Sequence, residues 1–256
     1  MLAEPCAHAL FLDIDGTLLG VAATPDSVRV PSGLVALLED LVRGLDGAAA
    51  ILTGRRVADA DRLFSPLRMV ASGVHGTELR MEAAGPTDIL AGPIPPDLIQ
   101  AINNVSSLHP GILVEQKGAG IAVHYRKAPE LREILESELA AVISAASYHL
   151  ALRKGRKVLE AVPSGYSKGT AMRQLLARMP FKGRRPVMIG DDVGDESAFL
   201  VAEQFGGVGL RVAGEHYDAA AADFDGVGSV RTWLKTLSSR LAQRQPGARN
   251  QTLHAG

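Results

Sequence analysis

Two carboxylic acids of the sequence stand where the chain would turn after a buried strand. Asp13 and Asp15 lie two residues apart in Asp13-Ile14-Asp15-Gly16-Thr17, directly after an apolar run that begins at Ala7. Alternation along an extended chain points both side chains to one side. One of them could therefore attack or bind a metal ion while the other serves as acid and base. The plainer interpretation is a strand–helix turn with a helix-capping Asp and a turn glycine.

A second acidic cluster, Gly190-Asp191-Asp192-Val193-Gly194-Asp195-Glu196, follows a predicted strand over residues 186–189. Four carboxylates in six residues repel one another strongly unless a cation or ligand is present, and oxygen ligands suit Mg²⁺. Acids that meet the dipole at a helix N-terminus are the alternative explanation. Because the carboxyl ends of strands meet at one edge of a sheet, both acidic clusters can converge on one ion.

Two shorter motifs offer groups that suit a phosphate. Thr53-Gly54-Arg55 ends a second strand with a hydroxyl and backbone amides at a helix start, an arrangement that cradles phosphate. Lys168, in Ser167-Lys168-Gly169-Thr170, could supply a fixed positive charge at the start of a helix. Alone, each motif is equally typical of an ordinary turn or a surface lysine.

Strands and helices that would position these groups alternate over the first seventy residues. Apolar runs predict strands over residues 7–14, 48–52 and 67–72. Between them lie a helix after an N-cap at Ser32, with apolar residues at helical spacing as far as Gly44, and a helix over 55–64. Short connections of this kind require right-handed crossovers and a parallel sheet covered by helices on both faces.

The pattern changes between residues 77 and 163. Gly-Pro and Pro-Pro pairs interrupt it, and alternating apolar residues predict two antiparallel hairpins, 112–116 with 121–125 and 149–153 with 157–162. Helices predicted near 96–106 and 129–146 complete an αββαββ unit. The parallel pattern then returns with a helix from Ser167, a strand over 186–189, a helix from Glu196 and a strand over 207–212.

These patterns predict an α/β fold in which an insertion splits a doubly wound domain with a parallel sheet. We expect a core of residues 1–76 and 164–240 and an inserted α+β cap of residues 77–163. The last residues, 241–256, are polar, contain Pro246-Gly247 and show no period, so we expect a disordered tail.

The ordered set of an Asp pair, a Thr, a Lys and a second acidic cluster at successive strand ends resembles the haloacid dehalogenase (HAD) superfamily of phosphotransferases. The resemblance implies that Asp13 attacks phosphorus to form an aspartyl-phosphate, and that Asp15 protonates the leaving alkoxide and then deprotonates water. It also implies that Thr53 and Lys168 hold the phosphoryl oxygens. The implied Mg²⁺ lies on Asp13, the main-chain carbonyl of Asp15 and Asp191, with Asp192 and Asp195 in support.

The insertion carries motifs that resemble the trehalose-6-phosphate phosphatase family. They are Gly73-Val74-His75-Gly76, Glu115-Gln116-Lys117-Gly118 and Val158-Leu159-Glu160-Ala161-Val162-Pro163. The resemblance implies that Glu115, Lys117 and Glu160 contact sugar hydroxyls. The expected substrate site is completed by Gly54, Arg55, His75, His124 and Arg126.

The resulting hypothesis is a Mg²⁺-dependent phosphatase that hydrolyses trehalose 6-phosphate, the last step of trehalose biosynthesis. One alternative is another capped sugar phosphatase, acting on sucrose phosphate, mannosyl-glycerate phosphate or mixed hexose phosphates. Another, from a different class of protein, is a catalytically silent sugar-phosphate sensor or regulatory partner of a synthase.

Composition argues against several other classes of protein. Lys and Arg number 27 against 28 Asp and Glu, and this net charge of −1 gives no electrostatic footprint for nucleic acid or an anionic membrane. No apolar run approaches the ~18–20 residues of a membrane span, and no basic segment starts a signal peptide. The single Cys6 excludes an internal disulfide. We therefore expect a cytoplasmic monomer whose partner is its small-molecule substrate.

Overall fold

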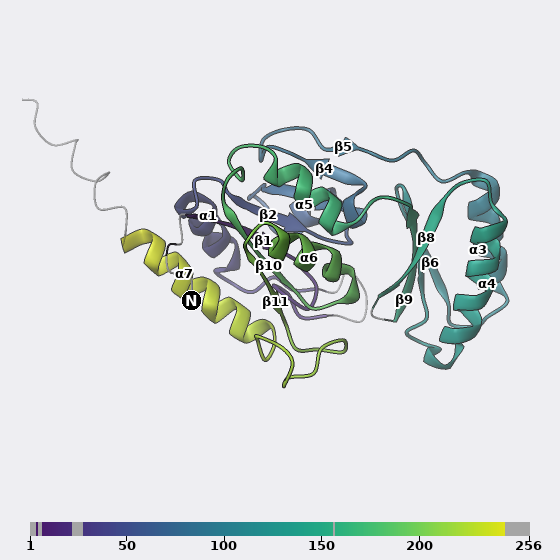
Figure 1. Ribbon diagram of the computed structural model, residues 1–256. Helices are drawn as coiled ribbons and strands as arrows, with labels where there is room; N and C mark the ends of the chain where they lie inside the picture. The colour runs from purple at the N-terminus through teal and green to yellow at the C-terminus, as the bar shows by residue number, and fades with distance from the viewer. Residues whose placement is uncertain (1–3, 5–6, 22–27, 156, 244–256) are drawn as a thin grey trace, which may run out of the picture.

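The computed structural model describes residue 4 and residues 7–21, 28–155 and 157–243. These residues form two separate sheets that lie next to each other in the molecule (Figure 1). The larger sheet has the strand order β11-β10-β1-β2-β3-β4-β5. Its strands are β1 (His8–Leu12), β2 (Ala49–Leu52), β3 (Val70–Gly73), β4 (Glu78–Arg80), β5 (Asp88–Ile89), β10 (Arg185–Gly190) and β11 (Val208–Arg211).

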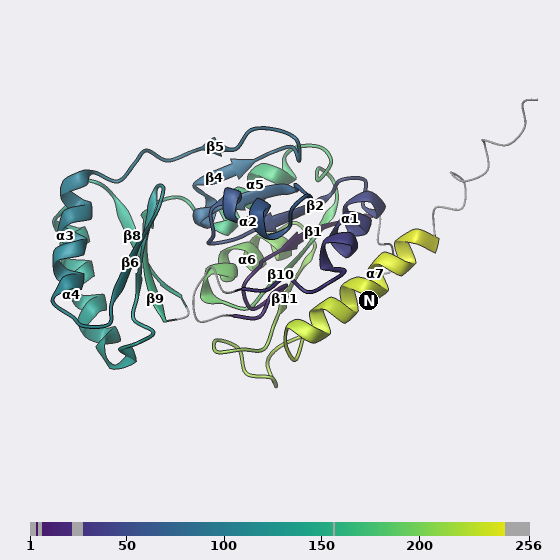
Figure 2. The same ribbon diagram turned by 180° about the vertical axis from the view of Figure 1, so that it is seen from behind.

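Five of these strands are parallel, and β1 lies in the middle of them. The chain runs through β2 and β3 on one side and through β10 and β11 on the other. Right-handed crossovers then place the connecting helices on opposite faces. Figure 1 shows α5 and α6 in front of the sheet, and Figure 2, from behind, shows α1 and α2. Their bounds are α1 (Leu34–Gly44), α2 (Val57–Leu63), α5 (Lys168–Leu176) and α6 (Glu196–Gln204). The predicted doubly wound α/β fold is confirmed.

The N-terminus of α1 differs from the prediction. The N-cap is Gly33, with a left-handed backbone at φ 80°, and no side chain caps the helix, so Ser32 does not have the expected role. A residue without a Cβ adopts this backbone at little cost, and the chain can therefore turn into the helix one residue later. The predicted apolar face is correct, because Leu34, Leu37, Leu38 and Leu41 are buried.

A long C-terminal helix was absent from the prediction. Helix α7 (Val227–Gln243) buries Val230, Leu234, Leu237 and Leu241 and packs against α1. It extends three residues into the segment predicted as a tail, of which residues 244–256 lie outside the described chain. No helix within the described ranges is long and apolar enough to cross a membrane.

The smaller sheet is antiparallel, with the strand order β6-β7-β9-β8, and contains both predicted hairpins. Helices α3 and α4 cover its outer face, so its other face is turned toward the large sheet (Figure 1). The bounds are α3 (Pro96–Ser107), β6 (Leu113–Lys117), β7 (Gly120–His124), α4 (Arg132–Ala145), β8 (Leu150–Gly155) and β9 (Val158–Pro163). A separate apolar cluster, which includes Ile102, Ile121 and Leu135, lies between these helices and strands.

Strands β4 and β5 were not predicted, and they belong to the large sheet. Each pairs antiparallel with the strand before it, starting from β3. Both strands lie in the segment that the sequence analysis assigned to the inserted unit, yet they are hydrogen-bonded to the core sheet. We propose that the cap begins after β5 and comprises α3, α4 and the four-stranded sheet.

Helix α5 begins with a capping box. The Ser167 hydroxyl accepts a hydrogen bond from the Thr170 amide at 3.0 Å, and the Thr170 hydroxyl accepts one from the Ser167 amide at 2.8 Å. The box therefore fixes the first turn, in which Lys168 lies.

We expect Ser167→Ala to lower the free energy of unfolding by about 1 kcal/mol, because one helix amide loses its acceptor. Urea denaturation followed by circular dichroism measures this change. Ser144→Ala is the control, since the exposed Ser144 hydroxyl only contacts the carbonyl of Ala141 in α4. Equal stability of the two variants would contradict the prediction.

Candidate active site

The first acidic motif lies at the carboxyl end of β1, the strand from which the order of the sheet proceeds outward on both sides. Asp13 follows β1 and Asp191 follows β10, the strand that pairs with β1. The Asp13 amide donates to the Ile189 carbonyl at 3.0 Å, which fixes the two strand ends side by side. Ligands of open α/β sheets bind in the crevice at such a reversal of strand order. The sheet topology therefore brings the two acidic motifs together, as the sequence predicts.

Lys168 connects the two acidic motifs. Its Nζ lies 2.6 Å from Asp13 Oδ1 and 2.6 Å from Asp195 Oδ1, and all three side chains are buried. Burial acts to lower the pKa of Lys168, but the charges of Asp13 and Asp195 outweigh it and raise that pKa well above its usual range. The ammonium is therefore a permanent positive charge beside Asp13.

Asp195 also organises the acidic loop after β10. Its Oδ2 accepts hydrogen bonds from the amides of Asp191 and Asp192, each at 3.1 Å. The opposite loop makes room for Asp191 through Gly16, which has φ +83°; a Cβ there would lie 1.9 Å from Asp191 Oδ2. The close approach of these loops requires a glycine at position 16.

The carboxylates of Asp13, Asp191 and Asp195 each offer an oxygen, and these oxygens all lie within 4.8 Å of one another. Burial, followed by the charges of Asp195 and Asp191, raises the pKa of Asp13 well above its usual range, although Lys168 opposes the shift. When all three carboxylates are ionised, the single ammonium leaves an excess of two negative charges. A divalent cation with oxygen ligands fits this donor set in both chemistry and charge.

The carboxylates of Asp15 and Asp192 have other partners. Both carboxylate oxygens of Asp15 accept from Arg55, Oδ2 from Nε at 2.5 Å and Oδ1 from a terminal nitrogen at 2.7 Å. Asp192 Oδ1 accepts from the Val193 amide at the start of the next turn. Burial raises the pKa of Asp192. Both residues nevertheless line the same cavity as Asp13 and Asp191, and the expected roles of the Asp15 main-chain carbonyl and of Asp192 at a metal stay predictions.

The loop after β2 presents the predicted phosphate-binding groups to the same crevice. Thr53 is buried, and its hydroxyl accepts from the Arg55 amide at 3.1 Å. Gly54 packs against His75, because a Cβ at Gly54 would lie 2.7 Å from His75 Nε2. Arg55, which was expected to touch substrate, holds the Asp15 carboxylate and also lines the cavity described below. Thr53 and Gly54 line the same cavity, as predicted.

The inner face of the cap sheet carries a chain of alternating charges. His124 Nε2 lies 2.9 Å from Glu115 Oε2, Lys117 Nζ lies 3.8 Å from that same oxygen, and Lys117 Nζ lies 3.2 Å from Glu160 Oε1. The hydrogen bond from His124 lowers the pKa of Glu115. Burial acts to raise the pKa of Glu160, but His75 and Lys117 hold it well below its usual range. Both carboxylates are therefore ionised acceptors.

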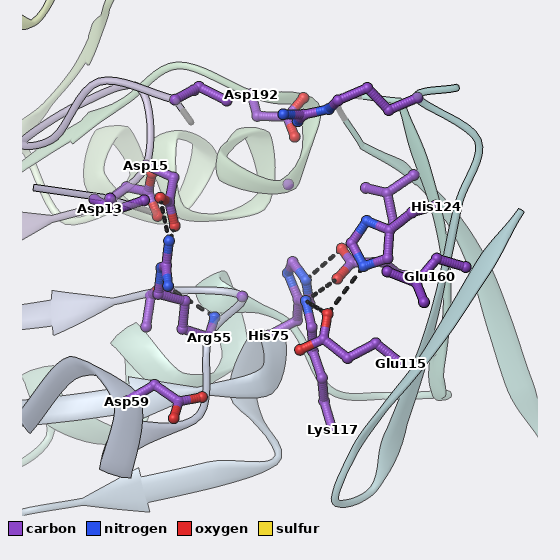
Figure 3. Close-up of a pocket in the computed structure, with 18 of the residues that line it drawn as sticks. Asp13, Asp15, Arg55, Asp59, His75, Glu115, Lys117, His124, Glu160 and Asp192 are labelled. Atoms are coloured by element: carbon purple, nitrogen blue, oxygen red, sulfur yellow. Dashed lines mark hydrogen bonds and ion pairs between the residues drawn. The ribbon is translucent and has the colours of Figure 1, made fainter. Parts of the chain in front are cut away.

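One cavity of about 580 Å³ joins the two groups of residues. Figure 3 shows Asp13, Asp15 and Arg55 on one side, facing Glu115, Lys117, His124 and Glu160 on the other. Apart from Asp195, every predicted site residue lines this cavity: Asp13, Asp15, Thr53, Gly54, Arg55, His75, Glu115, Lys117, His124, Arg126, Glu160, Lys168, Asp191 and Asp192. Asp195 lies behind Lys168.

The sequence analysis missed some residues of the cavity wall. Asp59 of α2 lies four residues after Arg55, a helical spacing that could have indicated it. Ile112, Leu113 and Val158 add an apolar part on the cap side, and nothing distinguished them from ordinary strand residues.

If the site has the phosphatase activity that the sequence predicts, we expect Gly16→Ala to lower it by at least about tenfold, because a methyl group there displaces the Asp191 carboxylate and strains a left-handed backbone. Phosphate release under saturating substrate measures the loss. Gly20→Ala is the matched control, since nothing lies within 4 Å of a Cβ at Gly20. Comparable activity of the two variants would show that the close approach is not needed.

A second prediction concerns the stability contributed by the Glu160 carboxylate. Because folding lowers the Glu160 pKa from its ordinary value of 4.5, its contribution is fully present above about pH 4.5 and is lost as the pH falls further. The excess thermal stability of the wild type over Glu160→Gln should therefore shrink below that pH. Melting temperatures between pH 7 and pH 3 test this, with exposed Glu133→Gln controlling for the lost charge. A constant difference would contradict it.

Comparisons with known proteins identify relatives over most of the chain. The trehalose-phosphatase family model matches residues 11–218. The trehalose-6-phosphate phosphatase of Escherichia coli (strain K12) is 36% identical over 245 residues, which are 95% of this chain and 91% of that protein. A probable trehalose-phosphate phosphatase of Sinorhizobium fredii is 40% identical over 210 residues, 80% of this chain and 77% of that protein.

Solved structures show the same fold at lower identity. The C-terminal domain of the C. albicans trehalose-6-phosphate phosphatase has a TM-score of 0.77 at 19% identity, covering 91% of this chain and 92% of that one. A trehalose-6-phosphate phosphatase related protein has a TM-score of 0.70 at 23% identity, covering 93% of this chain and all of the other. These similarities bear out the predicted α/β fold.

Proposed function

Because the chain belongs to the trehalose-phosphatase family, we propose that it hydrolyses trehalose 6-phosphate to trehalose and inorganic phosphate, the last step of trehalose biosynthesis. The observation that carries the proposal is the single cavity in which Asp13 and Lys168 face Glu115, Lys117 and Glu160. One wall suits a phosphoryl group and the other suits sugar hydroxyls.

In the first step, an Asp13 oxygen attacks phosphorus, the bond from phosphorus to the sugar oxygen breaks, and an aspartyl-phosphate forms. Asp15 delivers a proton to the departing alkoxide. Lys168 and Thr53 neutralise and orient the phosphoryl oxygens, since phosphoryl transfer depends on alignment and charge stabilisation. The 2.6 Å contact between Lys168 Nζ and Asp13 Oδ1 supports these roles, because it fixes the orientation of the nucleophile.

In the second step, Asp15 takes a proton from water, which attacks phosphorus and releases phosphate and free Asp13. The two hydrogen bonds from Arg55 hold the Asp15 carboxylate in one orientation toward the cavity. Arg55 therefore acts on Asp15 in this proposal, in addition to any contact with substrate phosphate.

We propose Mg²⁺ as the cofactor, held by Asp13, Asp191 and the main-chain carbonyl of Asp15, with Asp192 and Asp195 in support. When bound, it supplies positive charge that offsets the phosphate and the clustered acids. The excess negative charge of the buried group Asp13, Asp191 and Asp195 supports a divalent ion.

On the cap, Glu115, Lys117 and Glu160 bind sugar hydroxyls through charge-assisted hydrogen bonds. Their mutual ion pairs support this role, because charged groups that are already held in place lose little further conformational entropy when they bind a polyol. His124, which lies on the neighbouring strand β7 and also lines the cavity, orients Glu115 at 2.9 Å. Arg126, at the cavity wall, completes the proposed sugar site.

The proposal predicts phosphate release from trehalose 6-phosphate that requires Mg²⁺ and exceeds release from sucrose 6-phosphate, glucose 6-phosphate and p-nitrophenyl phosphate. Asp13→Asn should abolish turnover, because a carboxamide cannot form the aspartyl-phosphate. Equal rates on all four substrates would still support a phosphatase but would exclude the proposal that the cap selects trehalose 6-phosphate. No release from any substrate would favour a silent sugar-phosphate sensor.

Removing one cap charge should separate sugar binding from chemistry. We expect Lys117→Met to raise the KM for trehalose 6-phosphate by about tenfold or more, since it removes charge-assisted hydrogen bonds. Steady-state kinetics measure this change, with exposed Lys182→Met as the matched control. An unchanged KM for Lys117→Met would remove Lys117 from the substrate site.

A further inference from the structure

A strained turn joins β3 to β4 beside the cavity. Val74 and His75 are consecutive residues with positive φ, at 44° and 52°. Left-handed backbone is unfavourable for side chains with a Cβ, especially a β-branched valine, and persists only where the surroundings impose it. Both residues are buried. We call this pair the docking turn.

Main-chain hydrogen bonds tie the docking turn to the loop after β2. The His75 amide donates to the Thr53 carbonyl at 3.3 Å, and the Val74 amide donates to the Arg55 carbonyl at 2.9 Å. The two residues of that loop with proposed roles in chemistry therefore share a backbone network with the turn. A shift of the turn would move Thr53 and the Arg55 partner of Asp15.

The same turn touches the cap through both of its side chains. His75 Nε2 lies 2.6 Å from Glu160 Oε2 of β9. Val74 packs on the first residue of β7, where a Cβ added to Gly120 would lie only 2.9 Å from Val74 Cγ1. Figure 3 shows His75 pointing across the cavity toward Glu160, away from Asp13.

Glu160 is held by one partner from each side of the cavity. Lys117 of the cap contacts Oε1 at 3.2 Å, and His75 of the core contacts Oε2 at 2.6 Å. The carboxylate is buried, so losing either partner leaves one oxygen poorly compensated. The orientation of Glu160 therefore depends on where the core places His75.

We propose that the docking turn is the point at which the cap seats on the core, and that His75 is a positioning residue that aligns Glu160 with the sugar. The inference deepens the proposed function and rests on it for the identity of the sugar. It changes the predicted role of His75 from a substrate contact to a link between sugar recognition and the Thr53–Arg55 loop. A substrate that fills the cap side thus stabilises the arrangement on the phosphoryl side.

A double-mutant cycle tests this role through kcat/KM for trehalose 6-phosphate. We expect His75→Ala to lower kcat/KM by about tenfold or more, mainly through KM. The double variant His75→Ala/Glu160→Gln should lose no more than about twice as much as the worse single variant, because both changes break one interaction. The proposal would be overturned if the fold-loss in kcat/KM of the double variant equalled the product of the two single losses, or if His75→Ala had wild-type kinetics.

Comparing two substrates distinguishes loss of Glu160 alignment from a general structural defect in His75→Ala. A structural defect would lower kcat/KM for trehalose 6-phosphate and for p-nitrophenyl phosphate by the same factor. Loss of Glu160 alignment should lower kcat/KM for trehalose 6-phosphate more than for p-nitrophenyl phosphate. His75→Gln, which retains a hydrogen-bond donor, should recover part of the loss and serves as the test if His75→Ala does not fold. The matched control is His109→Ala, which breaks the 2.7 Å His109–Glu138 contact elsewhere in the cap and should change kcat/KM less than twofold.

The wild-type substrate panel separates failure of this inference from failure of the proposed function. If the wild type prefers another sugar phosphate, trehalose 6-phosphate is the wrong substrate, and the same cycle is run on the preferred one. Non-additive losses there would still support the docking turn. Multiplying losses there would overturn it.

Discussion

The buried contact of Lys168 with Asp13 and Asp195 constrains the rest of the core. An ammonium and two carboxylates with almost no solvent exposure are stable only when their partners are placed closely, because each charge has lost its hydration. Asp13 comes from β1, Lys168 from the first turn of α5, and Asp195 from the turn before α6. The position of three separate elements is therefore fixed by one charge cluster, and the capping box at Ser167 fixes the first turn from which Lys168 extends.

The same cluster explains why the site is built from two sheets. The core crevice concentrates buried charged groups, which suit the phosphoryl group of the proposed substrate better than its sugar. The cap sheet provides a second charged surface, with Glu115, Lys117 and Glu160 already paired among themselves. His75 of the core is a further partner of Glu160 in the cap. The docking turn holds the two surfaces at one distance, and the cavity between them is about 580 Å³.

Much of the fold could be predicted because its signals are local. Alternating and continuous apolar runs indicated the parallel strands and both cap hairpins, since side-chain direction repeats every two residues in a strand. Strands β4 and β5 were not predicted, because each is short and contains polar residues. Their place at the sheet edge depends on pairing that starts from β3. Helix α7 was not predicted, because polar residues between its apolar positions obscured the pattern. Its buried residues nevertheless repeat at helical spacing: Val230, Leu234, Leu237 and Leu241.

The chemistry of the site was in the sequence, and the partners of each side chain were not. Residue types and their order at the strand ends indicated Asp13, Asp15, Thr53, Lys168 and Asp191, because a strand end and the following turn are set by neighbouring residues. Three contacts were decided only by the tertiary structure. Arg55 donates hydrogen bonds to Asp15, forty residues away in sequence, and Lys168 donates to Asp13, 155 residues away. The third is the contact of His75 with Glu160. Such pairs depend on how sheets and hairpins pack, and no local pattern of residues encodes that packing.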